Sequence, residues 1–241
     1  MAKKRIDIML VEKGLAESRA KAQAMIMAGD VLADGKIVLK AGTLVNKDAD
    51  VSVAEPPPFV SRGGLKLDYG LGYFGLDVRD AVVADIGAST GGFTDCLLKR
   101  GVRRVYAVDV GYGQLDYRLR QDPRVIVMDR VNARNTPDIR EKLDMVVIDV
   151  SFISVEKIIP AVAGLLKEKG SIIVLVKPQF EAKRKEVGKG GIIRQPEIHA
   201  RVLGRFVKWV TDNGYRLKGM VGSPIEGASG NREFLTWLKL T

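Results

Sequence analysis

Cysteine and histidine are almost missing from this chain. Its 241 residues include one of each, Cys96 and His199. A lone cysteine cannot close an internal disulfide, and such cysteine usage is typical of proteins in a reducing compartment. The same scarcity leaves no set of histidines and cysteines for a zinc site, so we expect no bound metal. We interpret Cys96 as a packing residue and His199 as a structural residue on a helix.

Long apolar runs are missing as well. No stretch approaches the roughly 20 consecutive apolar residues that a membrane-spanning helix needs. The basic start, MAKKRIDIMLVEKG, has no uninterrupted hydrophobic core of the kind found in secretory signals. These absences predict a soluble, cytoplasmic protein without stable membrane insertion. The oligomeric state stays open.

Acidic residues are outnumbered by basic ones. The chain has 39 lysines and arginines against 29 aspartates and glutamates, a formal net charge of +10. Such an excess predicts a polyanionic partner. Residues 1–58 are nearly balanced, with nine basic and eight acidic residues, so the excess belongs to residues 59–241. Basic clusters occur there at residues 99–104 and at residues 183–185.

A run of prolines divides the chain. The segment Glu55-Pro56-Pro57-Pro58 cannot continue a helix or a central strand. It predicts a small α+β domain with a Pro-rich linker over residues 1–58 and a larger domain over residues 59–241. In the small domain we expect two helices, the second between a Ser18 cap and a Gly29 stop, followed by short strands around the Asp34-Gly35 turn.

Four hydrophobic runs of the larger domain each end in an aspartate. They are AVVAD, VYAVD, VIVMD and MVVID, ending at Asp85, Asp109, Asp129 and Asp149, with gaps of 24, 20 and 20 residues. Each gap has room for a strand and a crossover helix, which predicts a parallel sheet. Ligands bind at the carboxyl ends of such strands. We therefore expect the four carboxylates to line a pocket for a ligand with hydroxyl, amine or cationic groups.

A glycine loop, GASTGGF, follows the first of these aspartates. Gly87, Gly91 and Gly92 do not fit the G-x-G-x-x-G spacing of dinucleotide-binding loops. A carboxylate at Asp85 would repel a pyrophosphate, but it can hold an ammonium group directly or through water. These features favour S-adenosylmethionine, which carries an amino acid, a sulfonium and a ribose but no phosphate.

The remaining hydrophobic patterns complete an α/β, Rossmann-like fold with a seven-stranded, mostly parallel sheet. We expect strands at residues 81–85, 104–109, 125–128, 144–150, 171–177, 215–222 and 232–239, and helices at residues 91–100, 113–120, 154–168 and 196–212.

Four polar residues of this domain are not explained by their hydrophobic surroundings. Lys66 lies at a helix start, Asp149 and Lys177 end strands, and Glu233 opens the last strand. An unpaired charged lysine at the end of a buried strand would cost several kcal/mol. Strand ends converge on one crevice, so Asp149 and Lys177 can meet there. A lysine kept neutral by desolvation and by a neighbouring cation such as Lys66 suits proton removal from a ribose 2′-hydroxyl during methyl transfer.

The first domain resembles the S4 RNA-binding domain. The pattern R-I-D-x-x-L-V-E-K-G-L-A-x-S-R-x-K-A and its continuation through D-G-K cover most of residues 5–52. The resemblance implies that the second helix and the adjacent turn face RNA. The residues presented there would be Arg5, Ser18, Arg19, Lys21, Gln23 and Lys36.

The second domain resembles the FtsJ-type 2′-O-methyltransferases. The motif DIGASTGGFTDCLL, the Asp-ended strands and the order Lys66, Asp149, Lys177, Glu233 match their K-D-K-E tetrad. With an S4 domain in front, SRGGLKL at the junction and VKPQFE after the fifth strand, the whole chain is similar to the TlyA family. That resemblance implies methylation of cytidine 2′-hydroxyls in ribosomal RNA.

The resemblance also implies a cofactor site and its residues. S-adenosylmethionine would be bound by Asp85, Gly87, Ser89, Thr90, Gly91, Gly92 and Phe93, with Asp109 on its ribose and Asp129 near its adenine. Two alternatives stay open: a membrane-lytic protein, which the family's hemolysin name suggests, and a non-catalytic RNA-binding protein. The segment from residue 181 to 193 has little to bury, and we expect it to be mobile and to order on RNA through Lys183, Arg184 and Lys185.

Overall fold

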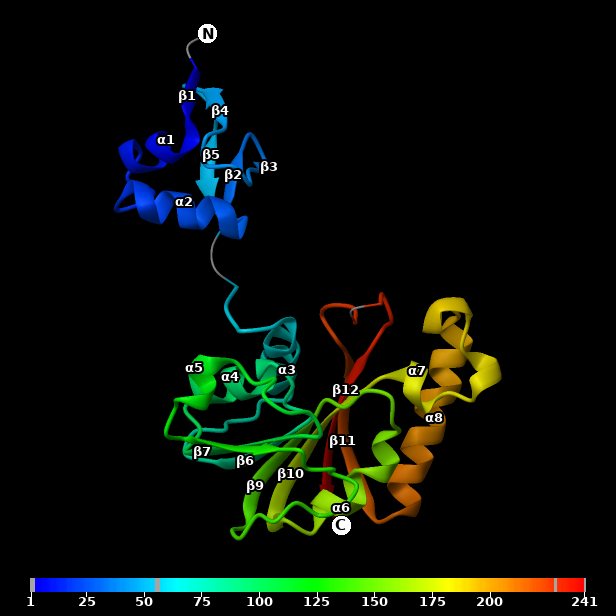
Figure 1. Ribbon diagram of the computed structural model, residues 1–241. Helices are drawn as coiled ribbons and strands as arrows, with labels where there is room; N and C mark the ends of the chain where they lie inside the picture. Colours follow the sequence, from blue (N-terminus) through cyan, green and yellow to red (C-terminus); the bar gives the residue numbers. More distant parts are fainter. Residues whose placement is uncertain (1–2, 55–56, 228, 241) are drawn as a thin grey trace. The chain divides into compact units, whose positions relative to one another are not determined.

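The computed structural model describes residues 3–54, 57–227 and 229–240. The chain divides into two compact units, residues 1–57 and 58–241 (Figure 1). Glu55 and Pro56 of the expected linker lie outside the described residues.

The described residues of the first unit form two helices and five short strands: β1 (Lys3–Arg5), α1 (Ile6–Glu12), α2 (Arg19–Ala28), β2 (Val31–Ala33), β3 (Lys36–Ile37), β4 (Leu44–Asn46) and β5 (Val51–Val53). The strands pair antiparallel, β1 with β4 and β2 with both β3 and β5. Helix α2 begins where the Ser18 hydroxyl accepts the N–H of Lys21 at 3.2 Å. It ends at Gly29, whose φ of 83° lies in the left-handed region that favours glycine.

The second unit is built on a seven-stranded sheet in the order β11-β12-β10-β9-β6-β7-β8. These strands are β6 (Val82–Ile86), β7 (Arg104–Asp109), β8 (Val125–Asp129), β9 (Leu143–Ile148), β10 (Leu166–Val176), β11 (Tyr215–Gly222) and β12 (Phe234–Leu240). Strands β6 to β10 are mutually parallel, whereas β12 runs antiparallel to both β10 and β11. The predicted Rossmann-like α/β class is therefore confirmed.

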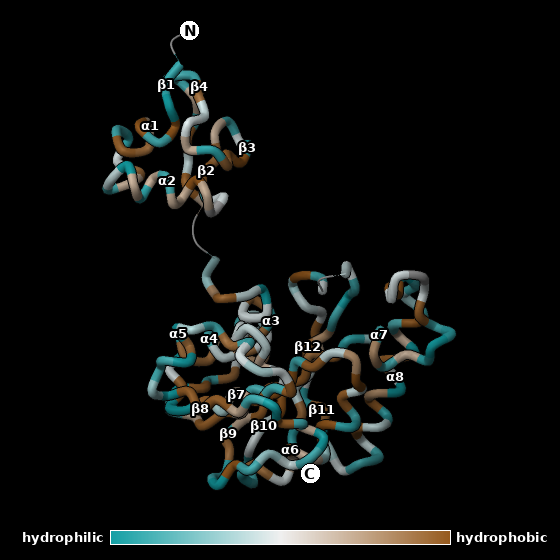
Figure 2. The backbone as a smooth tube through the Cα atoms, viewed as in Figure 1, coloured by the Kyte–Doolittle hydropathy of each residue, from teal (hydrophilic) through white to brown (hydrophobic). Residues whose placement is uncertain are grey.

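Helices cover both faces of this sheet (Figure 1). They are α3 (Arg62–Tyr73), α4 (Gly92–Lys99), α5 (Tyr117–Arg120), α6 (Ile159–Ala163), α7 (Pro178–Glu181) and α8 (Pro196–Asp212). Along β6, Val82 and Ala84 pack with α6 and α8, whereas Val83 packs with α3 and α4. Because successive side chains of a strand alternate between faces, strands at the centre of a sheet covered on both sides are largely apolar, as the brown stretches of the sheet in Figure 2 show.

Two predicted helices are shorter than expected. The helix predicted at residues 113–120 begins only at α5, because Gly113 has a φ of 70° and the Asp116 carboxylate caps the helix by accepting the Arg118 N–H. The helix predicted at residues 154–168 is reduced to a 3₁₀ turn and α6. Strand β10 begins already at Leu166, which pairs with Leu143 of β9.

Cys96 and His199 are both buried. Cys96 of α4 is fully buried, and burial raises the pKa of its thiol to about 12. His199 is 6% exposed and lies beside the Phe234 ring, and burial lowers its pKa. These surroundings fit the packing and structural roles predicted for them.

Candidate active site

The loop after β6 needs its glycines. Gly87 and Gly91 have φ angles of 85° and 97°, which side chains rarely adopt. A Cβ atom on Gly87 would lie 2.4 Å from the Asp149 carbonyl oxygen, and one on Gly91 would lie 2.3 Å from Leu119. At Gly87 the loop lies so close to the end of β9, and at Gly91 so close to α5, that only glycine fits at these two positions.

Asp109 fixes this loop from the end of β7. Its carboxylate accepts the N–H of Ser89 at 2.8 Å and that of Gly111 at 2.7 Å. The side chain also lines a cavity of about 560 Å³ at the carboxyl ends of β6, β7 and β9. The cavity combines apolar walls with a few polar groups, as cofactor sites do. Its lining includes Gly87, Ser89, Val108, Asp109, Gln114, Val131, Asn132, Ser151, Phe152 and Ile153.

Asp85 lies inside β6 rather than at its end, which corrects the sequence-based expectation. The strand continues to Ile86, and Asp85 is completely buried. One carboxylate oxygen accepts the Thr94 hydroxyl at 2.7 Å, and the other has no hydrogen-bond partner among the described residues. Desolvation raises the pKa of Asp85 to about 7. The negative charge of Asp149 also raises this pKa, whereas the hydrogen bond from Thr94 lowers it. The unpartnered oxygen fits a donor such as an ammonium group or a water that it holds.

Asp129 is engaged elsewhere. Its carboxylate forms an ion pair with Arg120 at 2.6 Å, which lowers its pKa. It is not among the described residues that line the 560 Å³ cavity, whose wall on this side is formed by residues 131–134. The structure therefore brings Asp109 and Asp149 to the cavity, but neither Asp85 nor Asp129.

The four tetrad residues form two ion pairs. Lys66 of α3 contacts Glu233 at 2.5 Å, and both side chains are more than nine-tenths buried. Lys177, directly after β10, lies with its Nζ atom 2.7 Å from Oδ1 of Asp149. Both lysines and Asp149 line a second cavity of about 180 Å³, together with residues 87–90, Gly92 and Phe93 of the glycine loop. The first and second cavities share Gly87, Ser89, Asp149 and Ser151, so the glycine loop borders both.

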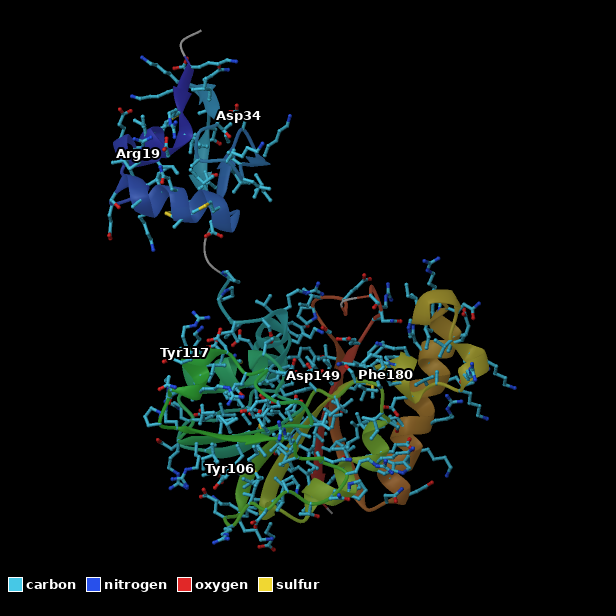
Figure 3. All side chains as sticks on the ribbon, in the orientation of Figure 1. Arg19, Asp34, Tyr106, Tyr117, Asp149 and Phe180 are labelled. Carbon is cyan, nitrogen blue, oxygen red and sulfur yellow. The ribbon has the colours of Figure 1, made fainter. Side chains whose placement is uncertain are left out.

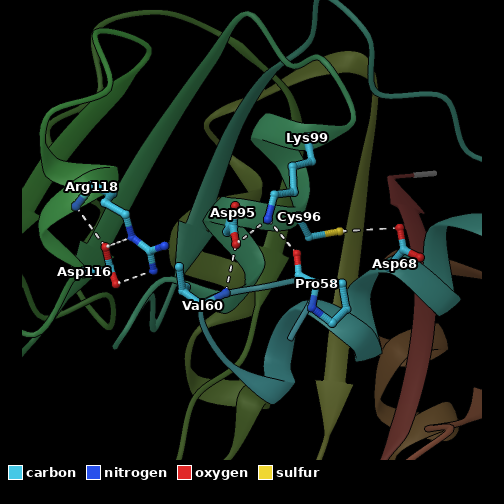
Figure 4. Close-up of polar contacts among 8 residues, drawn as sticks. All are labelled: Pro58, Val60, Asp68, Asp95, Cys96, Lys99, Asp116 and Arg118. Atoms are coloured by element: carbon cyan, nitrogen blue, oxygen red, sulfur yellow. Dashed lines mark hydrogen bonds and ion pairs between the residues drawn. The ribbon is translucent and has the colours of Figure 1, made fainter. Parts of the chain in front are cut away.

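Contacts in front of α3 fix the start of the helix that carries Lys66, and those of Pro58, Val60, Asp95 and Lys99 are drawn in Figure 4. Asp95 of α4 accepts the N–H of Val60 at 2.8 Å, and Lys99 donates to both Asp95 and the Pro58 carbonyl. Gly92 faces the same segment, since a Cβ atom there would lie 2.1 Å from the Ser61 hydroxyl. The start of α3 is thereby fastened to the helix that carries the glycine loop.

Ser151 and Phe152 at this site were missed by the sequence analysis. Ser151 accepts a hydrogen bond from Lys177 and lines both cavities. Phe152 is 91% exposed, has a φ of 64° and lies 5.1 Å, between ring centroids, from Phe180 (labelled with Asp149 in Figure 3). The feature of the sequence that could have identified them is their position directly after Asp149, at the end of a strand that leads into the site.

In the first unit, a buried acid gathers three of the predicted RNA-facing residues. Asp7 is fully buried and accepts hydrogen bonds from Arg5, Arg19 and Gln23 at 2.9–3.1 Å. The Arg5 hydrogen bonds are the largest cause of a pKa of Asp7 well below its usual range. The two arginine side chains remain 41% and 54% exposed. Asp7 thus orients these groups without covering them, whereas the Ser18 hydroxyl is used as a helix cap.

The segment at residues 181–193 buries more than expected. Glu181 accepts hydrogen bonds from the Ser154 hydroxyl and the Val155 N–H, and Ile193 is buried against α8. Glu186 pairs with Arg201 and Arg205 of α8. The expectation that this segment has little to bury is therefore wrong, although Lys183, Arg184 and Lys185 are exposed.

The fold and this pair of cavities define a Rossmann-like methyltransferase, the class of enzyme that uses S-adenosylmethionine. The model of the FtsJ-like methyltransferases matches residues 59–240, and that of the S4 domain matches residues 4–51. The chain belongs to the FtsJ-like methyltransferase family, in the TlyA group that carries an S4 domain in front.

Full-length relatives agree with this assignment. The Bacillus subtilis protein YqxC is 49% identical over 98% of this chain and 85% of its own length. A Mycobacterium tuberculosis protein named 16S/23S rRNA (cytidine-2'-O)-methyltransferase TlyA is 43% identical, with 98% of this chain and 89% of the relative covered. Brachyspira hyodysenteriae hemolysin A is 42% identical over 96% of this chain and 98% of its own. A solved structure from Streptococcus thermophilus, 43% identical, superposes with a TM-score of 0.76 and covers 100% of this chain and 90% of that one.

The hemolysin name of one relative raises the question of membrane insertion. In the described part of the chain, no helix is long and apolar enough to cross a membrane.

Proposed function

We propose that this protein methylates a ribose 2′-hydroxyl of ribosomal RNA in the cytoplasm, with cytidine as the target nucleotide. The observation that carries the proposal is the 180 Å³ cavity, in which two lysines and Asp149 meet the glycine loop. The activity for which the Mycobacterium tuberculosis relative is named supports the choice of ribosomal RNA and cytidine.

The 560 Å³ cavity would hold S-adenosylmethionine. Asp109 would accept hydrogen bonds from the ribose hydroxyls, with loop residues Gly87 to Phe93 against the methionine part. Asp85 is not among the described residues that line either cavity, so its unpartnered oxygen would reach the ammonium group through a water rather than directly. A contact between Asp129 and the adenine would require its ion pair with Arg120 to open.

Lys177 would act as the general base. When bound, S-adenosylmethionine supplies an electrophilic methyl group on a sulfonium. A ribose hydroxyl is a poor nucleophile near neutral pH, so Lys177 would take its proton at Nζ as the new bond forms. Asp149, 2.7 Å from Nζ, would stabilise the ammonium that results. Lys66, held by Glu233, would position the hydroxyl and its neighbouring phosphate.

The proposal is tested by incubating the protein with labelled S-adenosylmethionine and separated ribosomal subunits, free ribosomal RNA and liposomes. We expect label on RNA and no dye leakage from the liposomes. Leakage without RNA labelling would favour the membrane-lytic alternative. S-adenosylmethionine binding without transfer to either RNA sample would favour a non-catalytic RNA-binding protein.

We propose that the S4-like unit, residues 1–58 with the linker, delivers the RNA. Deleting these residues should leave a protein that binds S-adenosylmethionine with parental affinity, because both cavities belong to residues 58–241. Methylation of RNA should weaken through KM, since Arg5, Arg19 and Lys36 are lost. Titration calorimetry and steady-state kinetics check both parts. Equal kcat/KM for full-length and truncated proteins would show that the unit does not contribute to RNA binding.

The exposed cluster Lys183, Arg184 and Lys185 should contact RNA phosphates. Replacing all three by glutamine should weaken RNA binding and reduce the slope of log affinity against log salt by about 2, because each lost phosphate contact contributes roughly 0.7–0.9 to that slope. A matched control replaces Arg140, Arg216 and Lys218, three other exposed basic residues of the same unit. Filter binding between about 50 and 200 mM salt measures the slopes. Equal slopes in the two triple variants would rule out this contact.

A further inference from the structure

Ser151 lies at the boundary of the two cavities. It is the third residue after β9 and lines both the cofactor cavity and the cavity of the two lysines. Its hydroxyl oxygen accepts a hydrogen bond from Nζ of Lys177 at 2.9 Å. Asp149, two residues earlier, lies 2.7 Å from the same nitrogen. One short segment therefore places a hydrogen-bonded hydroxyl and a nearby carboxylate charge at one amine, although Oδ1 of Asp149 has no hydrogen-bond partner among the described residues.

Ser151 and Asp149 determine how a neutral amine can be oriented. The nitrogen of a neutral lysine carries one carbon substituent, two hydrogens and one lone pair. The Ser151 hydroxyl fixes one hydrogen through its hydrogen bond. The Asp149 charge, 2.7 Å from the nitrogen, repels the lone pair and favours the second hydrogen on its side, so the lone pair takes the remaining tetrahedral position. Without Ser151, the amine can rotate about its bond to Cε, and the lone pair points in several directions.

We propose that Ser151 is a positioning residue, which orients the lone pair of Lys177 toward the ribose hydroxyl. The inference rests on the proposed role of Lys177 as the base. The proton leaves the hydroxyl oxygen and forms the third N–H bond of Lys177. The other two N–H bonds stay intact, one donating to Ser151 and one on the side of the Asp149 charge. Ser151 keeps its own proton throughout.

The charges around Lys177 are left unchanged when Ser151 is replaced. Asp149 lies beside it at the end of β9, and Lys66 of α3, paired with Glu233, lines the same cavity. Ser151 is exposed, so Ser151→Ala should fold normally. The variant therefore removes one uncharged acceptor from Lys177 and neither adds nor removes a charged group. Ser151→Thr keeps the hydroxyl and serves as the conservative variant.

A first experiment measures the contact without any reaction. The cofactor-free protein is labelled with acetic anhydride from about pH 8 to 12, a range that spans the ordinary lysine pKa of about 10.4, and acetylation of Lys177 is quantified by mass spectrometry. Because the ammonium loses an acceptor, the pH midpoint for labelling Lys177 in Ser151→Ala should move down by at least about half a unit. Ser151→Thr should match the parent, as should Ser229→Ala, which removes an exposed serine of the loop before β12. The exposed Lys218 serves as an internal reference.

A second experiment measures the consequence for transfer. Ser151→Ala should lower kcat by about 10²-fold, the cost typical of a misplaced catalytic group, with little change in KM for RNA. S-adenosylmethionine affinity, measured by calorimetry, should stay parental, and Ser151→Thr should restore most of kcat.

The outcomes separate this inference from the proposed function. A parental labelling midpoint in Ser151→Ala overturns the inference, whether or not kcat falls, because Ser151 would then not act through Lys177. A shifted midpoint with parental kcat overturns it too, since the orientation would have no effect on transfer. If the parent protein transfers no methyl group to RNA, the proposed function fails, while the labelling experiment still decides whether Ser151 holds Lys177.

Discussion

Lys177→Ala should bind S-adenosylmethionine with parental affinity and lose methyl transfer by at least about 10²–10⁴-fold, the range typical of a removed acid–base group. Lys177 lines the small cavity but is not among the described residues that line the cofactor cavity, so its loss should leave the cofactor site intact. Single-turnover transfer to RNA and calorimetric titration measure the two quantities. Parental transfer by the folded variant would remove Lys177 from the reaction.

Lys177→Arg separates proton transfer from electrostatic stabilisation. A guanidinium keeps the positive charge beside Asp149 but does not release its proton near neutral pH. We therefore expect this variant to fail nearly as badly as Lys177→Ala. If arginine restores most of the rate, Lys177 acts through its charge, and the base has to be sought elsewhere, for example in a water held by Asp149.

S-adenosylmethionine binding should depend steeply on pH through Asp85. Burial raises the pKa of this carboxyl to about 7 in the protein without ligand. The ammonium group of the ligand favours the ionised carboxylate, so binding has to remove the Asp85 proton at acidic pH. The dissociation constant should rise by up to about tenfold for each pH unit below 7 and should level off above it. Calorimetric titration from pH 5 to 9, roughly two units on each side of the midpoint, measures the curve.

Asp85→Asn provides the control for this pH dependence. The amide cannot ionise, so the variant should bind weakly at every pH and lose the slope below pH 7. A parental slope in Asp85→Asn would assign the pH dependence to another group.

Asp85 should also make the stability of the ligand-free protein depend on pH, in the opposite direction to ligand binding. The pKa of Asp85 is higher in the folded protein than the value of about 3.9 expected for an unfolded chain. The folded state therefore binds the proton more tightly, and the free energy of unfolding falls as pH rises from about 4 to 7. At pH 8, Asp85→Asn should be more stable than the parent, by several kcal/mol at most. An aspartate that destabilises the ligand-free fold is consistent with a binding role.

Much of the fold follows from patterns that are local in sequence. Strands β6 to β9 are short apolar runs that the periodicity places within one or two residues, and Gly29 ends α2 as its sequence position indicates. Helix lengths between residues 154 and 168 were not predictable in the same way. The apolar residues there serve both α6 and the start of β10, and only the pairing of Leu166 with Leu143 decides between them.

In the candidate site too, some features follow from local sequence patterns and others arise only from contacts that the fold brings together. The meeting of Lys177 with Asp149 follows from parallel strand ends. Lys66 and Glu233 were also singled out in the sequence, but their pairing across 167 residues was not predicted, because no local pattern joins them. Asp85 was misplaced because β6 extends one residue beyond it. Asp7 and Ser151 were missed, since an acid or a serine in these positions looks like ordinary surface until its partners are brought to it by the fold.

The position of the methyl group on the nucleotide tests the proposed reaction most directly. RNA labelled by the protein is hydrolysed in alkali, and the products are separated by size. A 2′-O-methyl group removes the internal nucleophile of alkaline cleavage, so the label should remain in an alkali-resistant dinucleotide whose first residue is cytidine. It should be missing from RNA treated with Lys177→Ala. Label recovered in mononucleotides would mean that a base is methylated, and this would contradict a ribose hydroxyl as the acceptor and Lys177 as its base.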